Sequence, residues 1–271
     1  MMRKWFAVVA VCALSVVSLR ADVTVVTVMT MEGAAAAQMP PGSLPKITQR
    51  VKGMKARTDI EAGGTTISVI TDLVTKQVIT MMPNTKVAQV TTAASVAAGG
   101  APIDLPKMDM SLTPTGKSQT IAGFSCDEHT FKMLVDMASM SAQMPPEAAE
   151  MLKGVKMAMN GSIWVAKSAP GVAELMAFNK AALSSGLLTA MSGVKPGQVG
   201  GMEQLLNAAA AAPGIPYLTE MTMEMQGEGP MVQALKQMGA MKMIQKVSSV
   251  STDALADDLF KLPAGYTIEK K

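Results

Sequence analysis

The chain of 271 residues is 49% hydrophobic and only 3% aromatic, and it carries 24 basic and 21 acidic residues. Three of the basic residues, Arg3, Lys4 and Arg20, lie within the first 21 positions, so the rest of the chain is formally neutral. Because a nucleic-acid-binding surface needs a basic stripe or patch, this balance argues against nucleic acid as a partner. Cys126 is the only cysteine beyond residue 21, which excludes an internal disulfide in that part of the chain.

The first 21 residues have the three-part layout of a secretory signal. Two basic residues precede the apolar stretch 5–17, and the small residue Ala21 ends the segment. An apolar stretch of about 13 residues is shorter than the roughly 20 needed to span a bilayer. We therefore expect cleavage after Ala21, no transmembrane anchor after cleavage, and a single domain over 22–271. The expected location is the periplasm or outer envelope of a Gram-negative-type bacterium, or the medium.

Strand signals dominate the sequence beyond residue 21. The segment 22–31 consists mostly of β-branched residues, which favour strands over helices. In 51–60, Ala56 and Ile60 alternate with Arg57 and Asp59, so we expect one buried face and one charged, solvated face. Further short strand patterns between turn residues follow at 65–71, 77–82, 87–90, 117–124, 128–133, 162–166, 217–226 and 241–250. This spacing predicts a meander of antiparallel strands.

Segments of other character interrupt the strand pattern. Those near 33–45, 92–115 and 137–160 are rich in Ala, Gly, Pro or Thr, or favour a helix, and are predicted to be insertions in the single domain. Apolar residues at helical spacing predict one helix over 171–183 and a second around 202–212. We expect these helices to pack on the sheet.

Several motifs, taken in order, resemble a family of exported bacterial proteins known only as a domain of unknown function. No single motif is diagnostic, and together they span roughly two-thirds of the chain after the expected cleavage site. They are Gly53-Met-Lys-Ala-Arg-Thr-Asp59, Ile70-Thr-Asp-Leu-Val-Thr-Lys-Gln-Val-Ile79, Met82-Pro-Asn-Thr-Lys86, Thr120-Ile-Ala-Gly-Phe-Ser-Cys126, Ile163-Trp-Val165 and Leu259-Phe-Lys-Leu-Pro-Ala-Gly-Tyr266.

The resemblance implies a fold similar to that of the lipoprotein carriers of the bacterial envelope. These proteins form an α+β structure in which a curved antiparallel sheet, a half-barrel, has helices packed on its concave face. The resemblance also implies an apolar ligand, such as a lipid or the acyl chain of a lipoprotein, held in a hydrophobic groove. It implies no enzymatic activity that can be assigned to a residue. The alternative is a structural or protein-interaction module whose concavity is filled by its own helix.

The chain lacks the residue patterns of common enzymes. His129 is its only histidine, and Cys126 lies three positions before it. Positions three apart on a strand point to opposite faces, so the two do not form a catalytic pair. We expect Cys126 to be a small buried group and His129 to lie at the surface. No catalytic residue, cofactor site or metal site is assigned.

Methionine is the one compositional oddity, with 27 in the chain. Met221, Met223 and Met225 are spaced by two on a predicted strand and therefore share one face. Together with Trp164 they are the candidates for lining a ligand site. Three interpretations remain open: plain core filling in place of Leu and Phe, an adaptable wall for a flexible apolar ligand, or a thioether site for Cu(I).

Overall fold

The computed structural model describes the strands and the main helix of the chain. The expected signal, 1–21, and nearly all of the expected helix 202–212 lie outside the described residues. These residues are 22–33, 36, 39–40, 42–92, 95, 108–137, 154–187, 212–228, 232–233 and 240–270.

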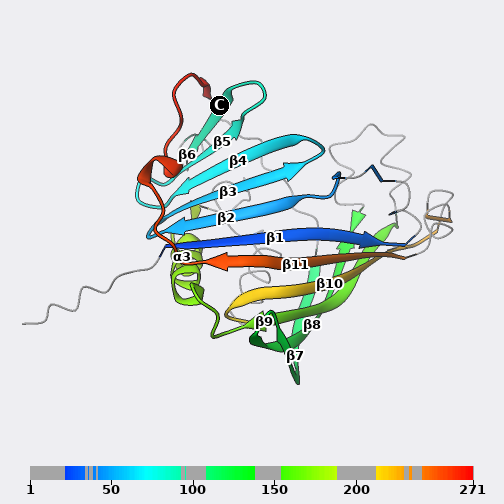
Figure 1. Cartoon of the computed structure of the whole chain (residues 1–271). Helices are drawn as coiled ribbons and strands as arrows, with labels where there is room; N and C mark the ends of the chain where they lie inside the picture. The colour runs from blue at the N-terminus through cyan, green and yellow to red at the C-terminus, as the bar shows by residue number, and fades with distance from the viewer. Residues whose placement is uncertain are drawn as a thin grey trace, which may run out of the picture.

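Within the described residues, twelve strands form one open sheet in the order β12-β6-β5-β4-β3-β2-β1-β11-β10-β9-β8-β7 (Figure 1). The first six strands follow one another along one half of the sheet, and β7 to β11 fill the other half. The predicted meander is therefore present twice, and the pairing of β1 with β11 joins the two parts. The strands are β1 (Val23–Glu32), β2 (Lys46–Lys52), β3 (Lys55–Ala62), β4 (Thr65–Asp72), β5 (Gln77–Met82), β6 (Val87–Thr92), β7 (Met108–Ile121), β8 (Phe124–Asp136), β9 (Lys156–Ala166), β10 (Ile215–Gln226), β11 (Met241–Ser251) and β12 (Thr267–Lys270).

The sheet is mixed, which corrects the expectation of a purely antiparallel one. All neighbouring strands are antiparallel except β12, which runs parallel to β6. The chain reaches β12 from β11 through a short 3-10 helix, η3 (Asp257–Phe260), which places the last strand at the edge beyond β6. A parallel neighbour needs a long connection, and the chain between β6 and β12 includes half of the sheet.

Two of the expected insertions are shorter than predicted. β7 begins at Met108, within 92–115, and β9 begins at Lys156, within 137–160. β7 is an edge strand whose described side chains are mostly exposed, so it needs few large apolar residues. An edge strand also tolerates Pro114, which cannot donate a ladder hydrogen bond. Composition alone therefore made the first part of this strand look like a loop, whereas the part from Lys117 onward was predicted as strand.

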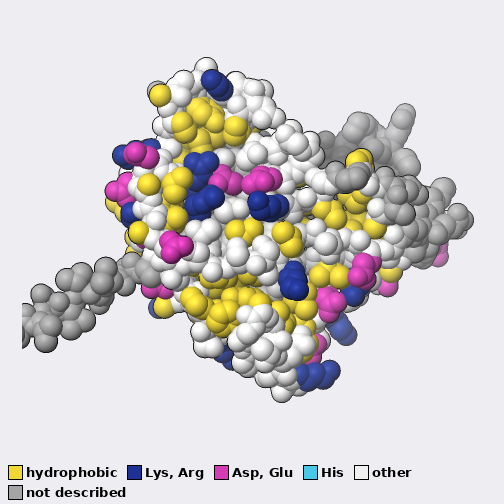
Figure 2. Space-filling view, in the orientation of Figure 1, with side chains coloured by type: hydrophobic (Ala, Val, Ile, Leu, Met, Phe, Trp, Pro, Cys, Tyr) yellow, Lys and Arg dark blue, Asp and Glu magenta, His cyan; other side chains and the backbone are white. Residues whose placement is uncertain are grey.

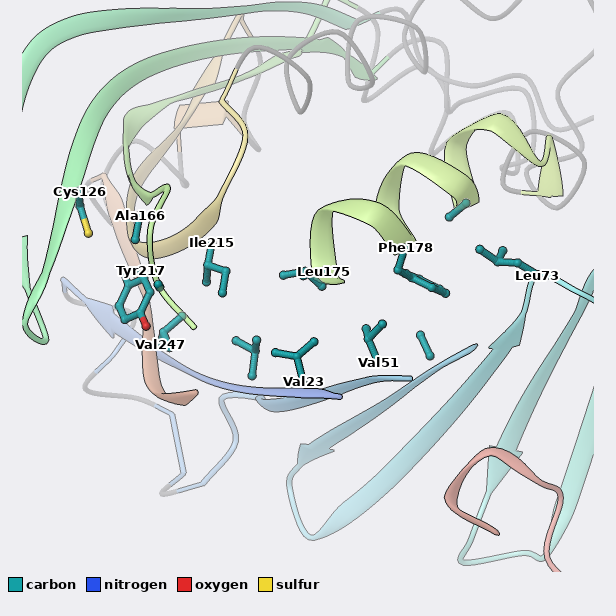
Figure 3. Close-up of a cluster of buried hydrophobic side chains, with 14 of the residues drawn as sticks. Val23, Val51, Leu73, Cys126, Ala166, Leu175, Phe178, Ile215, Tyr217 and Val247 are labelled. Atoms are coloured by element: carbon teal, nitrogen blue, oxygen red, sulfur yellow. The ribbon is translucent and has the colours of Figure 1, made fainter. Parts of the chain in front are cut away.

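The described residues contain one long α-helix, α3 (Val172–Ser184), which confirms the helix predicted over 171–183. Leu175, Phe178 and Ala182 of α3 are buried in a cluster with Val23 of β1 and Val51 of β2 (Figure 3). The helix therefore packs on one face of the sheet. Gly171 precedes it with φ 76°, and a Cβ at this position would lie 2.3 Å from a methyl group of Val23.

A second buried cluster lies on the other face of the sheet. Ile70, Met81 and Ala88 pack there against Leu262 and Tyr266 of the C-terminal segment. Ile70 is opposite Arg57 on β3, whereas the neighbouring Ala56 belongs to the cluster beneath α3. The two clusters therefore lie on opposite sides of the same strands.

Asp59 is 8% exposed, so the expectation that its face of β3 would be solvated is wrong at this residue. Its carboxylate accepts hydrogen bonds from Arg57, Ser68 and Arg50. Arg57 also donates from Nη1 to the carbonyl oxygen of Leu259 at 3.2 Å. The C-terminal segment thus contacts this charged face, and the carboxylate is buried with its partners rather than in water.

Candidate functional site: a methionine face on the sheet

One row of methionines crosses five neighbouring strands. Each member lies directly opposite the next in the strand register, and directly opposed residues of an antiparallel pair project to the same side of a sheet. The row is Met110 on β7, Met133 on β8, Met159 on β9, Met223 on β10 and Met241 on β11. Its five side chains therefore lie side by side on one face.

Adjacent positions on the same face extend this row. Met221 is opposite Met243, which is in turn opposite Met31 of β1, and Met157 is opposite Met225. Residues two apart on a strand share a face, so these methionines and the first row form one surface. We call it the methionine face, and its members are Met29, Met31, Met110, Met133, Met157, Met159, Met221, Met223, Met225, Met241 and Met243.

Each methionine of this face is partly exposed, and none belongs to the buried core. Met81, by contrast, is 1% exposed in the cluster on the other side of the β4–β6 strands. Partial exposure means that these side chains retain apolar surface that a further molecule can cover.

The reverse side of the same strands is charged. Glu220, on the face opposite Met221, forms a salt bridge with Lys242 of β11 at 2.9 Å. This contact and the charge of Glu220 raise the pKa of Lys242. Figure 2 shows Lys and Arg interspersed with Asp and Glu on the displayed side of the molecule. β10 and β11 therefore have thioethers on one side and an ion pair on the other.

The structure brings together three of the four predicted lining residues. Met221, Met223 and Met225 share the methionine face, as the spacing of two predicted. Trp164 does not, because it lies opposite Leu218, one position out of phase with the methionines of β10. It is partly buried and packs against the cluster that includes Leu175 of α3. Alternation on β9 alone left the face of Trp164 undecided, and the register decides it.

His129 is only 5% exposed, so the expectation that it lies at the surface is wrong. It sits on β8 opposite Ile163 and Pro114, and alternation places it on the same side as Phe131 and Met133. Directly opposed residues of an antiparallel pair project to the same side at short distance, so Pro114 and Ile163 flank the imidazole. Its Nδ1 is buried and has no hydrogen-bond partner.

Cys126 is fully buried, as predicted, and burial raises the pKa of its thiol. Its Sγ donates to the carbonyl oxygen of Phe124 at 3.5 Å. The ring of Phe124 lies 5.3 Å from that of Tyr217, whose pKa is also raised by burial. A thiol whose pKa is raised is a poor nucleophile, so this environment supports a packing role for Cys126.

The described residues border two shallow depressions. One, of about 370 Å³, is bordered by Lys52, Lys55 and Lys261. Each of these lysines already pairs with an aspartate, at 2.8, 3.1 and 2.9 Å respectively, so no unpaired ammonium faces an incoming anion. The other depression, of about 420 Å³, is bordered by Met110 and Met133 of the methionine face and also by Lys132 and Asn160, which lie opposite each other on β8 and β9. Alternation puts this pair on the side away from Met133 and Met159.

Within the described parts of the chain, no group of three or more His, Cys, Asp and Glu side chains is arranged to hold a metal ion. Those parts also contain no helix with the length and apolar character needed to cross a membrane. Comparisons of the chain with protein-family models and with curated proteins found no match.

Proposed function

We propose that this is an exported, non-enzymatic binding protein that holds a flexible apolar ligand against its methionine face. A lipid or the acyl chain of a lipoprotein has the required chemistry. The observation that carries the proposal is the row of five directly opposed, partly exposed methionines across β7 to β11. Methionine is unbranched and polarisable, so a surface of such side chains adapts to an apolar molecule of variable shape.

Binding would be driven by removal of apolar surface from water. Such burial contributes about 25 cal/mol per Å², or about 0.8 kcal/mol for each buried CH₂ group. The neighbours of Met221 at its level are Phe131, Gly161 and Met243, and none of them is charged. An acyl chain laid along this face would therefore meet no ionic group at that level, and affinity would increase with chain length.

The proposal includes a finer account of the fold. We infer that the open sheet is a half-barrel with α3 on its concave side, as in the lipoprotein carriers that the sequence motifs resemble. The packing of Leu175 and Phe178 against Val23 and Val51 supports this inference, because it places the helix against one face only. The secretory layout of residues 1–21 supports export to the envelope or the medium.

A second candidate is a structural or protein-interaction module that holds no ligand. The packing of α3 favours it, because Leu175, Phe178 and Ala182 already fill the space above the N-terminal part of β1. On this view the methionine face is covered by a protein partner or by other parts of the chain. The two candidates differ in whether a small apolar molecule binds saturably.

A fluorescent fatty-acid titration of the purified protein tests the proposal. We expect saturable binding that strengthens from a C10 to a C16 chain. Met223→Glu places a charge on the methionine face and should weaken binding at least tenfold. Thr222→Glu is the matched control, because the adjacent residue lies on the other side of β10, opposite Lys242, and should leave binding unchanged.

The result also separates the two candidates. Absence of saturable binding by the unmodified protein would favour the module without a ligand. Equal losses in Met223→Glu and Thr222→Glu would place the ligand elsewhere. Circular dichroism of both variants establishes that the sheet is intact in each.

A further inference from the structure

Thioether sulfur is also a soft metal donor, and three neighbouring strands carry a methionine at directly opposed positions. Met223 of β10 lies between Met159 of β9 and Met241 of β11 in the register. Directly opposed residues have Cβ atoms about 4.5 to 5.5 Å apart, which a methionine side chain can span from either side. The three sulfur atoms can therefore converge above the central strand.

We propose that Met159, Met223 and Met241 form a binding site for a soft monovalent cation, Cu(I) or its analogue Ag(I). Thioether and thiolate ligands select Cu(I), whereas imidazole and carboxylate oxygen suit other metals. Met221 and Met243, opposite each other at the next level, supply further donors on β10 and β11. This site is independent of the apolar ligand, although both use the same face.

The composition of the face limits which metals fit it. Calcium and magnesium require oxygen ligands, and zinc prefers Cys and His. Among the described residues, no carboxylate, thiol or imidazole lies in the strand register directly opposite Met159, Met223 or Met241. His129, whose Nδ1 is unpartnered, lies four residues from Met133 along β8 and is too far along the strand to join the three sulfur atoms.

The position of the site follows from Gly161. This residue occupies the place on β9 opposite Met221, where a Cβ would lie 2.9 Å from Cε1 of Phe131. Opposite Met221, β9 therefore has no sulfur atom, and the phenyl ring of Phe131 lies beside Gly161. Methionines on β9, β10 and β11 are therefore directly opposed only at the position of Met223. At the position of Met221, only β10 and β11 supply a sulfur atom.

An anaerobic competition experiment tests the site, with Cu(I) supplied as its bicinchoninate complex to the purified protein. We expect the protein to remove one equivalent of copper from the chelator, and Met223→Leu to weaken copper binding at least tenfold. Zn(II), offered in parallel, should not bind. Met81→Leu is the matched control, because Met81 is buried on the other side of the sheet and should not affect copper.

Leucine keeps a side chain of similar apolar surface but removes the sulfur, so loss of copper binding in Met223→Leu reports the donor atom. The proposed function is tested separately, by fatty-acid titration of the unmodified protein. No transfer of copper, or equal binding by Met223→Leu, would overturn the metal site while leaving the lipid proposal intact. Copper binding without saturable fatty-acid binding would refute the lipid proposal and support the metal site.

Discussion

Arg57 and Asp59 lie two residues apart on β3, and Nε of the arginine donates to both carboxylate oxygens of the aspartate, at 2.9 and 3.2 Å. Ser68 Oγ donates to the same carboxylate at 2.6 Å, and Arg50 pairs with it from β2. Burial alone would raise the pKa of Asp59. The hydrogen bonds from Ser68 and Arg57 and the arginine charge outweigh that effect, so its pKa is lowered.

Asp59→Asn should therefore destabilise the fold at neutral pH. Removing one member of a buried ion pair leaves Arg57 and Arg50 without their partner, which typically costs about 3 kcal/mol. Urea denaturation at pH 7 measures the loss. Asp109→Asn, an exposed carboxylate on β7, is the control and should change stability by less than about 0.5 kcal/mol.

The same network predicts how stability depends on pH. The pKa of Asp59 is lower in the folded protein, so its stabilising contribution is present above the pKa of the unfolded chain. That contribution is lost as the pH falls through the folded-state pKa. The free energy of unfolding should thus fall less steeply with acidification in Asp59→Asn than in the unmodified protein. Parallel slopes between pH 5 and pH 2 would contradict this prediction.

Gly161→Ala should destabilise the sheet because there is no room for a side chain. A Cβ at this position would lie 1.9 Å from the carbonyl oxygen of Glu220 and 2.9 Å from Cε1 of Phe131. Overpacking of this kind costs about 1 to 3 kcal/mol, and here the β10 backbone itself would have to move. Asn160→Ala, at the neighbouring exposed position, is the control in the same urea experiment. Equal stability of the two variants would rule out this close approach.

His129→Leu should leave stability unchanged or raise it by up to about 1 kcal/mol. Replacing a buried polar group that has no partner with an apolar one relieves a desolvation penalty. Phe131→Ala, two residues along β8 and 6% exposed, is the comparison, and large-to-small changes of this kind cost about 3 to 5 kcal/mol. Thermal unfolding monitored by circular dichroism measures both. A marked loss in His129→Leu would mean that the imidazole makes an essential contact.

Two methionines distinguish a core role from a surface role. Met81→Ala should cost about 2 to 5 kcal/mol, because it leaves a cavity in a fully buried cluster. Met223→Ala, on the methionine face, should cost less than about 1 kcal/mol, because a partly exposed side chain loses less burial. Similar losses in urea denaturation would support the interpretation of the methionine face as plain core.

Most strands of the first half of the sheet were predictable, because β1, β3 to β6 and also α3 follow from local composition and periodicity. β2 was not, because the alternating pattern predicted one strand over 51–60, whereas the structure has a turn between Lys52 and Lys55. The first part of β7, before Lys117, was not predictable, because an edge strand with two exposed faces has the composition of a loop. The environment of Asp59 was also missed, since the C-terminal segment that contacts its face lies about 200 residues away, and alternation within β3 carries no information about it.

The candidate site was only partly readable from the sequence. The spacing of Met221, Met223 and Met225 showed that these residues share a face. It could not show that Met223 stands between Met159 and Met241, because register depends on turn lengths and bulges between distant segments. Trp164 was grouped with them only because it lies on a strand, and a one-residue difference in phase separates it from Met221.

The central position of β1 imposes an order on folding. This strand lies between β2, its immediate successor, and β11, where Val25 stands opposite Val250. One edge of β1 can therefore pair with β2 early in folding. The other edge can pair only after β11, which lies near the end of the chain, is available. Contacts of such high sequence separation slow folding because a long loop must close before they form. During that interval the exposed edge of β1 is a place where a chaperone would bind and where aggregation would start.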